Sequence, residues 1–247
     1  MVDSIQPQAA EEIFGVNDKK QLAEAEKIKR KQAADKLLEG GTTLADPERI
    51  DIRGDLICGK DVFIDVNVVF DGNVTISEGA NIGPHSVISN STIGRNTKIL
   101  SHCNLEGASV GDNCSVGPFA RLRPGTELMD SARAGNFVEI KKSQIGQHSK
   151  VSHLSYIGDA MVGNEANIGA GTITCNYDGA DKHETIIEDN VFVGSGVELV
   201  APVVIKEGAT IGAGSTITKQ APKDKLTLER ANQKTISNWK RPKKKTT

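Results

Sequence analysis

The stretch IEDNVFVGSGVELVAPVVIKEGATIGAGSTI, residues 187–217, decides the fold because one aliphatic residue returns at every sixth position. These positions are Ile187, Val193, Leu199, Ile205, Ile211 and Ile217, and two places before each from Val193 onward lies Val191, Val197, Val203, Ala209 or Ser215. An amphipathic helix would repeat at three, four and seven, and a half-buried strand alternates without an accent at six. The six-residue period instead predicts a parallel β-helix, in which each hexad forms one flat wall and three walls complete a coil.

The same period continues through most of the chain if single residues are dropped at intervals. Its aliphatic positions before the opening stretch are Ile64, Phe70, Ile76, Ile82, Ile88, Ile93, Ile99, Leu105, Val110, Val116, Leu122, Leu128, Ala134, Ile140, Ile145, Val151, Ile157, Val162, Ile168 and Thr174. We therefore expect a β-helix over residues 50–218. The polar segment 176–185 breaks the period and is expected to loop out from one edge, where binding sites often lie.

The remaining segments are expected to flank this solenoid. Residues 19–41 predict a capping helix that ends at two glycines, and its apolar stripe comprises Leu22, Ala25, Ile28, Leu37 and Leu38. We expect residues 1–18 to form a disordered leader and residues 219–247 to form a C-terminal arm with a basic tail. A helix at the open end would cover coil edges whose backbone groups are otherwise unpaired.

Composition fits stacked narrow coils and limits the functional classes. Only 4% of the residues are aromatic, so the core must be built from Ile, Val and Ala, and the net charge of −2 argues against a general nucleic-acid binder. Any anionic ligand must be held by a local cluster of cations. The four cysteines lack zinc-ribbon spacing, and no apolar run is long enough to span a bilayer. These features predict a cytoplasmic protein with free thiols and no membrane partner.

The register of the coils predicts a cluster of cations on the outer surface. Leu122 and Ile140 are three hexads apart, so Arg123 and Lys141 should lie on neighbouring strands about 4.8 Å apart, with Lys142 nearby. Like charges on adjacent strands are unfavourable unless a dianion such as phosphate binds to them. The alternative is that these long side chains simply extend into water.

His153 is the candidate general base. It follows Val151 by two places, so it points outward, with Asn136 one coil before it and Ala170 one coil after it. Its reference pKa of about 6.5 suits proton transfer near neutrality, although an isolated surface histidine is more often inert. Tyr156 is also outward, and the small residues around Ala170 would let a ligand approach the backbone closely.

Several strings resemble one enzyme family. They are RLRPG at 121–125, GNFVEIKK at 135–142, HLSYIGDA at 153–160, NIGAGTITCNYDG at 167–179 and FVGS at 192–195. They look like the acetyltransferase half of bacterial bifunctional UDP-N-acetylglucosamine pyrophosphorylase/glucosamine-1-phosphate N-acetyltransferase. The likeness covers roughly residues 16–245. Hexapeptide repeats are shared by many acyltransferases, whereas the ungapped string 167–179 is specific to this family.

The resemblance implies a left-handed parallel β-helix, assembled as a homotrimer with active sites between subunits. It implies acetyl transfer from acetyl-CoA to the amine of glucosamine 1-phosphate, giving N-acetylglucosamine 1-phosphate for UDP-N-acetylglucosamine, peptidoglycan and lipopolysaccharide synthesis. It assigns His153 as the base and, as sugar-phosphate contacts, Arg123, Lys141, Tyr156, Asn167 and Lys182. It assigns as acetyl-CoA contacts Ala170, Asn176, Tyr177, Ser195, Ala213 and Arg230. Uridylyl transfer, the activity of the family's other half, is not expected of this chain.

Two other functions remain as alternatives. A trimeric metal hydratase of the γ-carbonic-anhydrase type would use histidines such as His148 and His153, but a third histidine is missing where Asp112 stands. A solenoid that serves only as a binding scaffold is the second alternative, and the outward cluster around His153 argues against it. We expect no metal, and we do not expect Cys175 to act as a nucleophile, because a thioester reacts directly with an amine.

Overall fold

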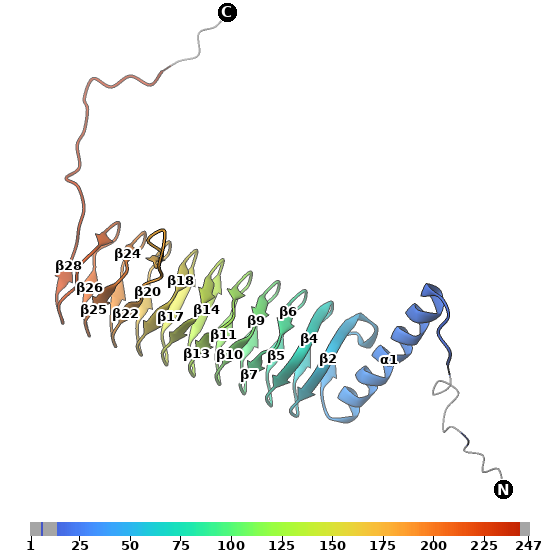
Figure 1. Cartoon of the computed structure of the whole chain (residues 1–247). Helices are drawn as coiled ribbons and strands as arrows, with labels where there is room; N and C mark the ends of the chain where they lie inside the picture. Colours follow the sequence, from blue (N-terminus) through green and yellow to red (C-terminus); the bar gives the residue numbers. More distant parts are fainter. Residues whose placement is uncertain (1–5, 7–13, 243–247) are drawn as a thin grey trace, which may run out of the picture.

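The computed structural model describes residue 6 and residues 14–242, and it shows one long β-solenoid with a helix at its N-terminal end (Figure 1). The expected leader, 1–18, lies mostly outside the described residues, as does 243–247 of the basic tail. The first wall is an 11-stranded parallel sheet. Its strands are β1 (Thr43–Leu44), β3 (Phe63–Ile64), β5 (Asn81–Ile82), β8 (Lys98–Ile99), β11 (Ser115–Val116), β14 (Arg133–Asn136), β17 (Lys150–His153), β20 (Asn167–Ile168), β23 (Phe192–Val193), β26 (Thr210–Ile211) and β28 (Leu226–Thr227).

The other two walls start together in the long strands β2 (Ile50–Cys58) and β4 (Val68–Ile76). The second wall continues through β6 (Val87–Ser89), β9 (Asn104–Glu106), β12 (Arg121–Leu122), β15 (Glu139–Lys141), β18 (Tyr156–Gly158), β21 (Ile173–Cys175), β24 (Glu198–Val200) and β27 (Thr216–Ile217). The third wall continues through β7 (Thr92–Ile93), β10 (Ala108–Val110), β13 (Thr126–Leu128), β16 (Ser143–Ile145), β19 (Ala160–Val162), β22 (Thr185–Ile187) and β25 (Val203–Ile205).

This arrangement confirms the predicted fold, a left-handed parallel β-helix of hexapeptide repeats. The aliphatic positions of the repeat are buried in one continuous column, and their partners Val191, Val197, Ala209 and Ser215 are at most 1% exposed. Burying a Val, Leu or Ile side chain contributes about 1.5–3 kcal/mol, so a column of them stabilises every coil. The strands extend from Thr43 to Thr227, somewhat beyond the expected range 50–218.

The chain turns at three corners, and many corner residues have positive φ. At the corner between the first and second walls stand Phe119 (φ 56°), Phe137 (φ 55°) and Leu154 (φ 49°). Such values are rare for bulky residues, because the side chain crowds the backbone. The stacked coils compensate, since each corner donates a backbone N–H to the preceding coil; one such bond joins Leu154 N to Asn136 O at 3.0 Å.

Helix α1 (Lys19–Glu39) covers the first coil. Asp18 caps its N-terminus by accepting a bond from Gln21 N at 2.7 Å, and Gly40 follows its last turn. Of the expected apolar stripe only Leu37 is buried, whereas Leu22 and Leu38 are 37% and 42% exposed. Ala34, which lies outside that stripe, is also buried. The helix therefore contacts the solenoid mainly through its C-terminal turns, and its N-terminal half extends away from the coils (Figure 1).

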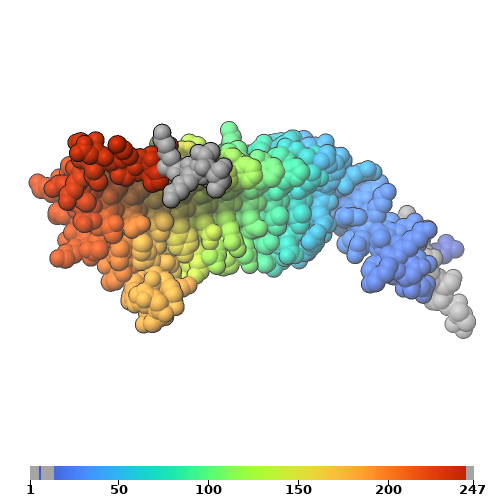
Figure 2. All heavy atoms as spheres, turned by 90° about the horizontal axis from the view of Figure 1, so that it is seen from above, coloured from blue at the N-terminus to red at the C-terminus, as the bar shows by residue number. Residues whose placement is uncertain are grey.

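Two segments depart from the coil pattern near its C-terminal end. Residues 176–184, between β21 and β22, protrude from the side of the prism (Figure 2). The arm after Thr227 runs away from the solenoid (Figure 1), and its residues Ile236 and Trp239 are 71% and 62% exposed.

Candidate active site

His153 ends strand β17 and is held by the coil before it. Its register partner is Asn136, seventeen residues earlier at the end of β14, and His153 Nδ1 lies 2.5 Å from Asn136 Oδ1. A carbonyl oxygen accepts hydrogen bonds, so Nδ1 carries the proton and Nε2 keeps its lone pair. The exposed ring can thus accept a proton at Nε2. The coil register predicts Asn136 beside His153, but it does not show that the Asn136 oxygen bonds the ring.

On the coils that follow, the positions equivalent to His153 are occupied by small residues. Gly171 N donates to His153 O at 3.4 Å, Gly196 N to Ala170 O at 2.7 Å, and Gly214 N to Ser195 O at 2.9 Å. These bonds place Ala170, Ser195 and Ala213 on successive coils after His153, each about 4.8 Å from the last. We call His153, Ala170, Ser195 and Ala213 the axial column.

The corner next to this column, between the first and second walls, carries large side chains before His153 and glycines after Leu154. Before His153 it carries Phe119 and Phe137, whose rings stack with centroids 5.3 Å apart. After Leu154 it carries Gly171, Gly196 and Gly214, all with positive φ. A Cβ added at Gly196 would meet no atom within 4 Å. The axial column is therefore bordered by an open shelf of backbone, on which a long, thin ligand could lie.

Arg230 follows the corner glycines beyond the last full coil. A Cβ added at Gly214 would lie 3.9 Å from Arg230 Cδ, and Arg230 is exposed. From His153 to Arg230 there are four coil steps, or about 19 Å at the usual strand spacing. Three of the residues expected to contact acetyl-CoA thus lie in one line that starts at the expected base, and Arg230 lies beside the corner glycine of the last coil.

The predicted register of the cations is confirmed. Leu122 pairs with Ile140, so Arg123 and Lys141 follow on neighbouring strands. Arg123 Nη1 is bonded to Glu139 Oε1 at 2.9 Å. The pKa of Lys141 is lowered, first by contact with the Lys182 ammonium group, then by burial, and also by Arg123, whereas Asp159 acts in the opposite direction. The neighbouring positive charges disfavour the charged form of Lys141, an effect that a bound anion would offset.

The insertion brings Lys182 to this cluster. It folds as a small hairpin in which Tyr177 and Lys182 form an antiparallel bridge. At its tip the Asp178 carboxylate accepts bonds from Asp181 N, the His183 ring and Ala180 N, and these bonds lower the pKa of Asp178. Tyr177 is 60% exposed, whereas Asn176 is buried at 7% exposure, with its amide bonded to Asp159.

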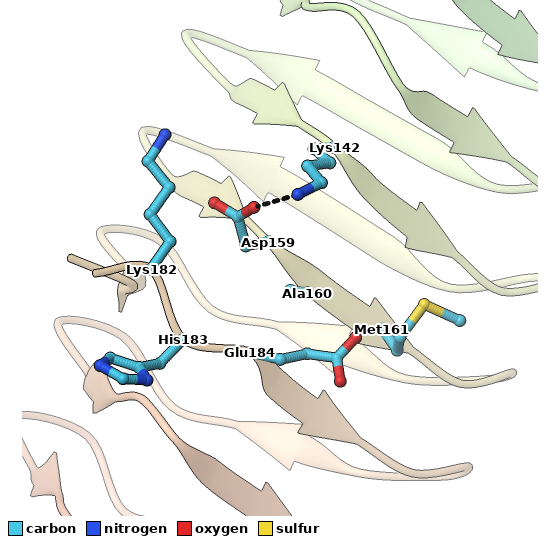
Figure 3. Close-up of a pocket in the computed structure, with 7 residues that line it drawn as sticks. All are labelled: Lys142, Asp159, Ala160, Met161, Lys182, His183 and Glu184. Carbon is cyan, nitrogen blue, oxygen red and sulfur yellow. Dashed lines mark ion pairs between the residues drawn. The ribbon is translucent and has the colours of Figure 1, made fainter.

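A hollow of about 190 Å³ lies between the insertion and the second–third corner. Its lining includes Lys142, Asp159, Lys182 and Glu184, and Figure 3 shows the ammonium group of Lys142 pointing at the adjacent Asp159 carboxylate. The Lys142 Nζ to Asp159 Oδ1 distance is 3.5 Å. The pairing explains why Lys142, expected to join the other cations, is partly neutralised.

The expected acceptor contacts lie on two different walls. Tyr156 begins β18 in the second wall, whereas Asn167 begins β20 in the first wall, where it pairs with Lys150. The convex corner at Leu154 separates these walls. Within one chain the two residues therefore belong to different faces of the prism.

His148 and His153, the histidines considered for a metal site, lie just before β17 and at its last residue. Among the described residues no group of three or more His, Cys, Asp and Glu side chains is placed to hold a metal ion. The pKa of Cys175 is raised by burial and by Glu198, which disfavours the thiolate that a nucleophile requires.

Known proteins match both the repeat and nearly the whole chain. Residues 184–219 match the bacterial transferase hexapeptide repeat (six repeats). The chain is 56% identical over 242 residues to the bifunctional protein GlmU of Cupriavidus pinatubonensis, and 56% identical over 241 residues to that of Ralstonia pickettii. This chain is a homologue of one half of GlmU. The matches include 98% of the chain but 53% of each relative, so the chain spans about half the length of the GlmU proteins it matches.

A solved structure supports the fold independently of GlmU. The Arabidopsis UDP-N-acetylglucosamine acyltransferase superposes with a TM-score of 0.62 at 16% identity, covering 71% of this chain and 68% of that chain. At such low identity the likeness concerns the fold alone. The GlmU homology confirms the family resemblance drawn from the motifs, while the roles of individual residues stay predictions. No described helix is long and apolar enough to cross a membrane.

Proposed function

We propose that this chain transfers the acetyl group of acetyl-CoA to the amine of glucosamine 1-phosphate, giving N-acetylglucosamine 1-phosphate and CoA. This product would serve UDP-N-acetylglucosamine synthesis, and hence peptidoglycan and lipopolysaccharide synthesis, in the cytoplasm. The observation that carries the proposal is the position of His153, whose free Nε2 lies where the axial column meets the wall that bears the cations. The homology to GlmU over 98% of the chain supports it.

The reaction requires alignment and the removal of one proton. The amine nitrogen attacks the thioester carbonyl, the C–S bond of the tetrahedral intermediate breaks, and the CoA thiolate leaves. His153 Nε2 accepts the proton that the amine loses and can pass it to the departing sulfur, so charge is conserved. A general base of this kind contributes about 10²- to 10⁴-fold, and alignment of amine and carbonyl contributes several kcal/mol more. Asn136 keeps the imidazole in the tautomer that can act as base.

The two substrates would approach His153 along different directions. The donor would lie along the axial column, with Ala170, Ser195 and Ala213 leaving room for its arm, and Arg230 would meet its phosphates. The phosphate of the acceptor would bind Arg123, Lys141 and Lys182, which places the sugar over Tyr156 and directs the amine toward His153.

We propose further that the active form is a homotrimer. Tyr156 and Asn167 lie on opposite sides of a convex corner, so both can contact one acceptor only if a second copy supplies one of them. The surface beside this corner is unusually apolar for exposed residues, since Phe119, Phe137 and Leu154 are 48%, 55% and 63% exposed. A neighbouring chain that packs there would also exclude water from His153, which strengthens electrostatic interactions at the site.

A direct assay tests the proposal. Purified chain would be incubated with acetyl-CoA and either glucosamine 1-phosphate or glucosamine 6-phosphate, and thiol release would be followed together with the mass of the sugar product. We expect acetylation of the 1-phosphate, and a His153→Ala variant should lower kcat by about 10²- to 10⁴-fold with little change in KM. Absence of acetylated sugar with the wild-type chain would refute the proposed function. Wild-type turnover by His153→Ala would refute the role of the histidine.

A further inference from the structure

Both ends of the insertion are bonded to one residue, Asp159. The Asp159 carboxylate accepts a bond from Asn176 Nδ2 at 2.6 Å, where the insertion leaves β21. The Asp159 backbone carbonyl accepts a bond from Thr185 N at 3.1 Å, where the insertion returns as β22. Asp159 precedes β19 on the previous coil, so the protruding hairpin is bound at its base to the rigid prism.

The surroundings of Asp159 make its side chain well suited to hold the hairpin. Its side chain is only 9% exposed, and its backbone has φ 47° at the second–third corner. Its second carboxylate oxygen faces Lys142 Nζ at 3.5 Å from the coil before. A nearly buried carboxylate that accepts a hydrogen bond and faces a cation has little freedom to move, so it provides a fixed anchor.

Asn176 connects Asp159 to the part of the hairpin that carries Lys182. Asn176 O accepts a bond from His183 N at 2.9 Å, and the hairpin closes through the Tyr177–Lys182 bridge. The next bond of the hairpin joins Asp178 N to Asp181 O at 3.2 Å, so Lys182 lies between two backbone hydrogen bonds, the first of which involves Asn176. The hollow beside Lys182 is lined by Asp159 itself. We propose that Asp159 is a positioning residue that holds the insertion so that Lys182 stands beside Lys141 and can bind the acceptor phosphate. The inference concerns the acceptor site and rests on the proposed function only for its kinetic consequence.

Two substitutions at Asp159 separate anchoring from charge. Asp159→Gly removes the carboxylate, while glycine keeps the positive φ and the backbone bond to Thr185. Asp159→Asn removes the charge, but its amide oxygen can still accept the bond from Asn176. Asp61→Gly is the matched control, because Asp61 also has positive φ (57°), is exposed and lies on the first coil, far from the insertion.

The first measurement is cleavage by trypsin after Lys182, followed by mass spectrometry of the folded chain. Trypsin needs a mobile, extended segment, so we expect Asp159→Gly to be cut after Lys182 at least about tenfold faster than wild type, whereas Asp159→Asn and Asp61→Gly should be cut at nearly the wild-type rate. Thermal unfolding of each variant checks that the rest of the coil is intact. Cleavage of Asp159→Gly at the wild-type rate would overturn the inference.

The second measurement is steady-state kinetics with acetyl-CoA and glucosamine 1-phosphate. A misplaced Lys182 weakens acceptor binding, so Asp159→Gly should raise KM for the sugar phosphate at least about tenfold while kcat stays within about threefold. A purely structural role would instead lower kcat by reducing the folded fraction, with KM unchanged, and this result would also overturn the inference. If the wild-type chain shows no activity, the proposed function fails, and the trypsin measurement still decides the role of Asp159.

Discussion

Replacing Asn136 by leucine tests whether a single hydrogen bond sets the chemistry of His153. Leucine resembles asparagine in size but has no oxygen to accept the Nδ1 proton, which now points at Asn136 Oδ1 across 2.5 Å. Without this acceptor the imidazole can protonate either nitrogen and can turn about its side-chain bonds. The fraction of enzyme with a lone pair on Nε2 directed at the amine then decreases.

The size of the effect follows from the strength of that bond. A hydrogen bond between neutral groups contributes about 0.5–1.5 kcal/mol, and 1.4 kcal/mol corresponds to a factor of ten. We therefore expect kcat to fall by about tenfold. The loss cannot exceed the whole contribution of the base, about 10²- to 10⁴-fold, which His153→Ala measures directly.

The assay is thiol release from acetyl-CoA at saturating sugar phosphate, with two companion variants. Asn136→Asp keeps an oxygen that accepts the Nδ1 proton, so it should retain more activity than Asn136→Leu. Asn81→Leu makes the same exchange at an exposed position of the first wall, far from His153, and should leave kcat unchanged. Wild-type kcat in Asn136→Leu, together with loss of activity in His153→Ala, would refute the orienting role of Asn136.

Three further changes probe the donor, the acceptor and the assembly. Gly196→Phe should raise KM for acetyl-CoA more than about tenfold by filling the open shelf, whereas Asn190→Phe, at another corner of the same coil with φ 59°, should leave it unchanged; equal KM values would refute the proposed donor path. Lys141→Gln should raise KM for glucosamine 1-phosphate about tenfold or more and leave unphosphorylated glucosamine unaffected, because a charge-assisted bond contributes about 1.5–3 kcal/mol. Phe137→Glu should lower the mass measured by light scattering toward that of one chain, since it places a carboxylate on an exposed ring position; an unchanged mass would exclude that corner from the interface.

Much of this architecture is visible in the sequence because the hexapeptide period is local. Each inward aliphatic residue of the repeat is buried, and counting in hexads correctly pairs Leu122 with Ile140. The same count predicted the neighbours of His153, since the coil there is one residue shorter than three hexads and joins residues seventeen apart. The packing of the helix was less well predicted. Because the helix covers only one end of the solenoid, it buries only Ala34 and Leu37, and most of its expected apolar stripe is not buried.

The contacts that build the candidate site depend on side-chain direction, which the period does not contain. Asn136 was recognised as a neighbour of His153, but whether its oxygen turns toward the ring depends on the packing of two coils. Asn176 stands seventeen residues after Asp159, at the usual coil offset, but the period does not show that its amide bonds the Asp159 carboxylate. The contact with Thr185 could not be counted from the period, because the insertion changes the coil offset there to twenty-five. The ion pair between Arg123 and Glu139 was likewise not predicted from the sequence.

The sequence by itself determined the winding of the chain, the burial of its aliphatic positions and the family to which its motifs point, because these depend on a repeat that each hexad carries within itself. Only the tertiary structure decided which atoms meet across coils, how the insertion is anchored and that Tyr156 and Asn167 lie on different walls on either side of the Leu154 corner. The physical reason is that hydrogen bonds and charge clusters act over a few ångströms between residues far apart in the chain, and a local period does not specify such distances.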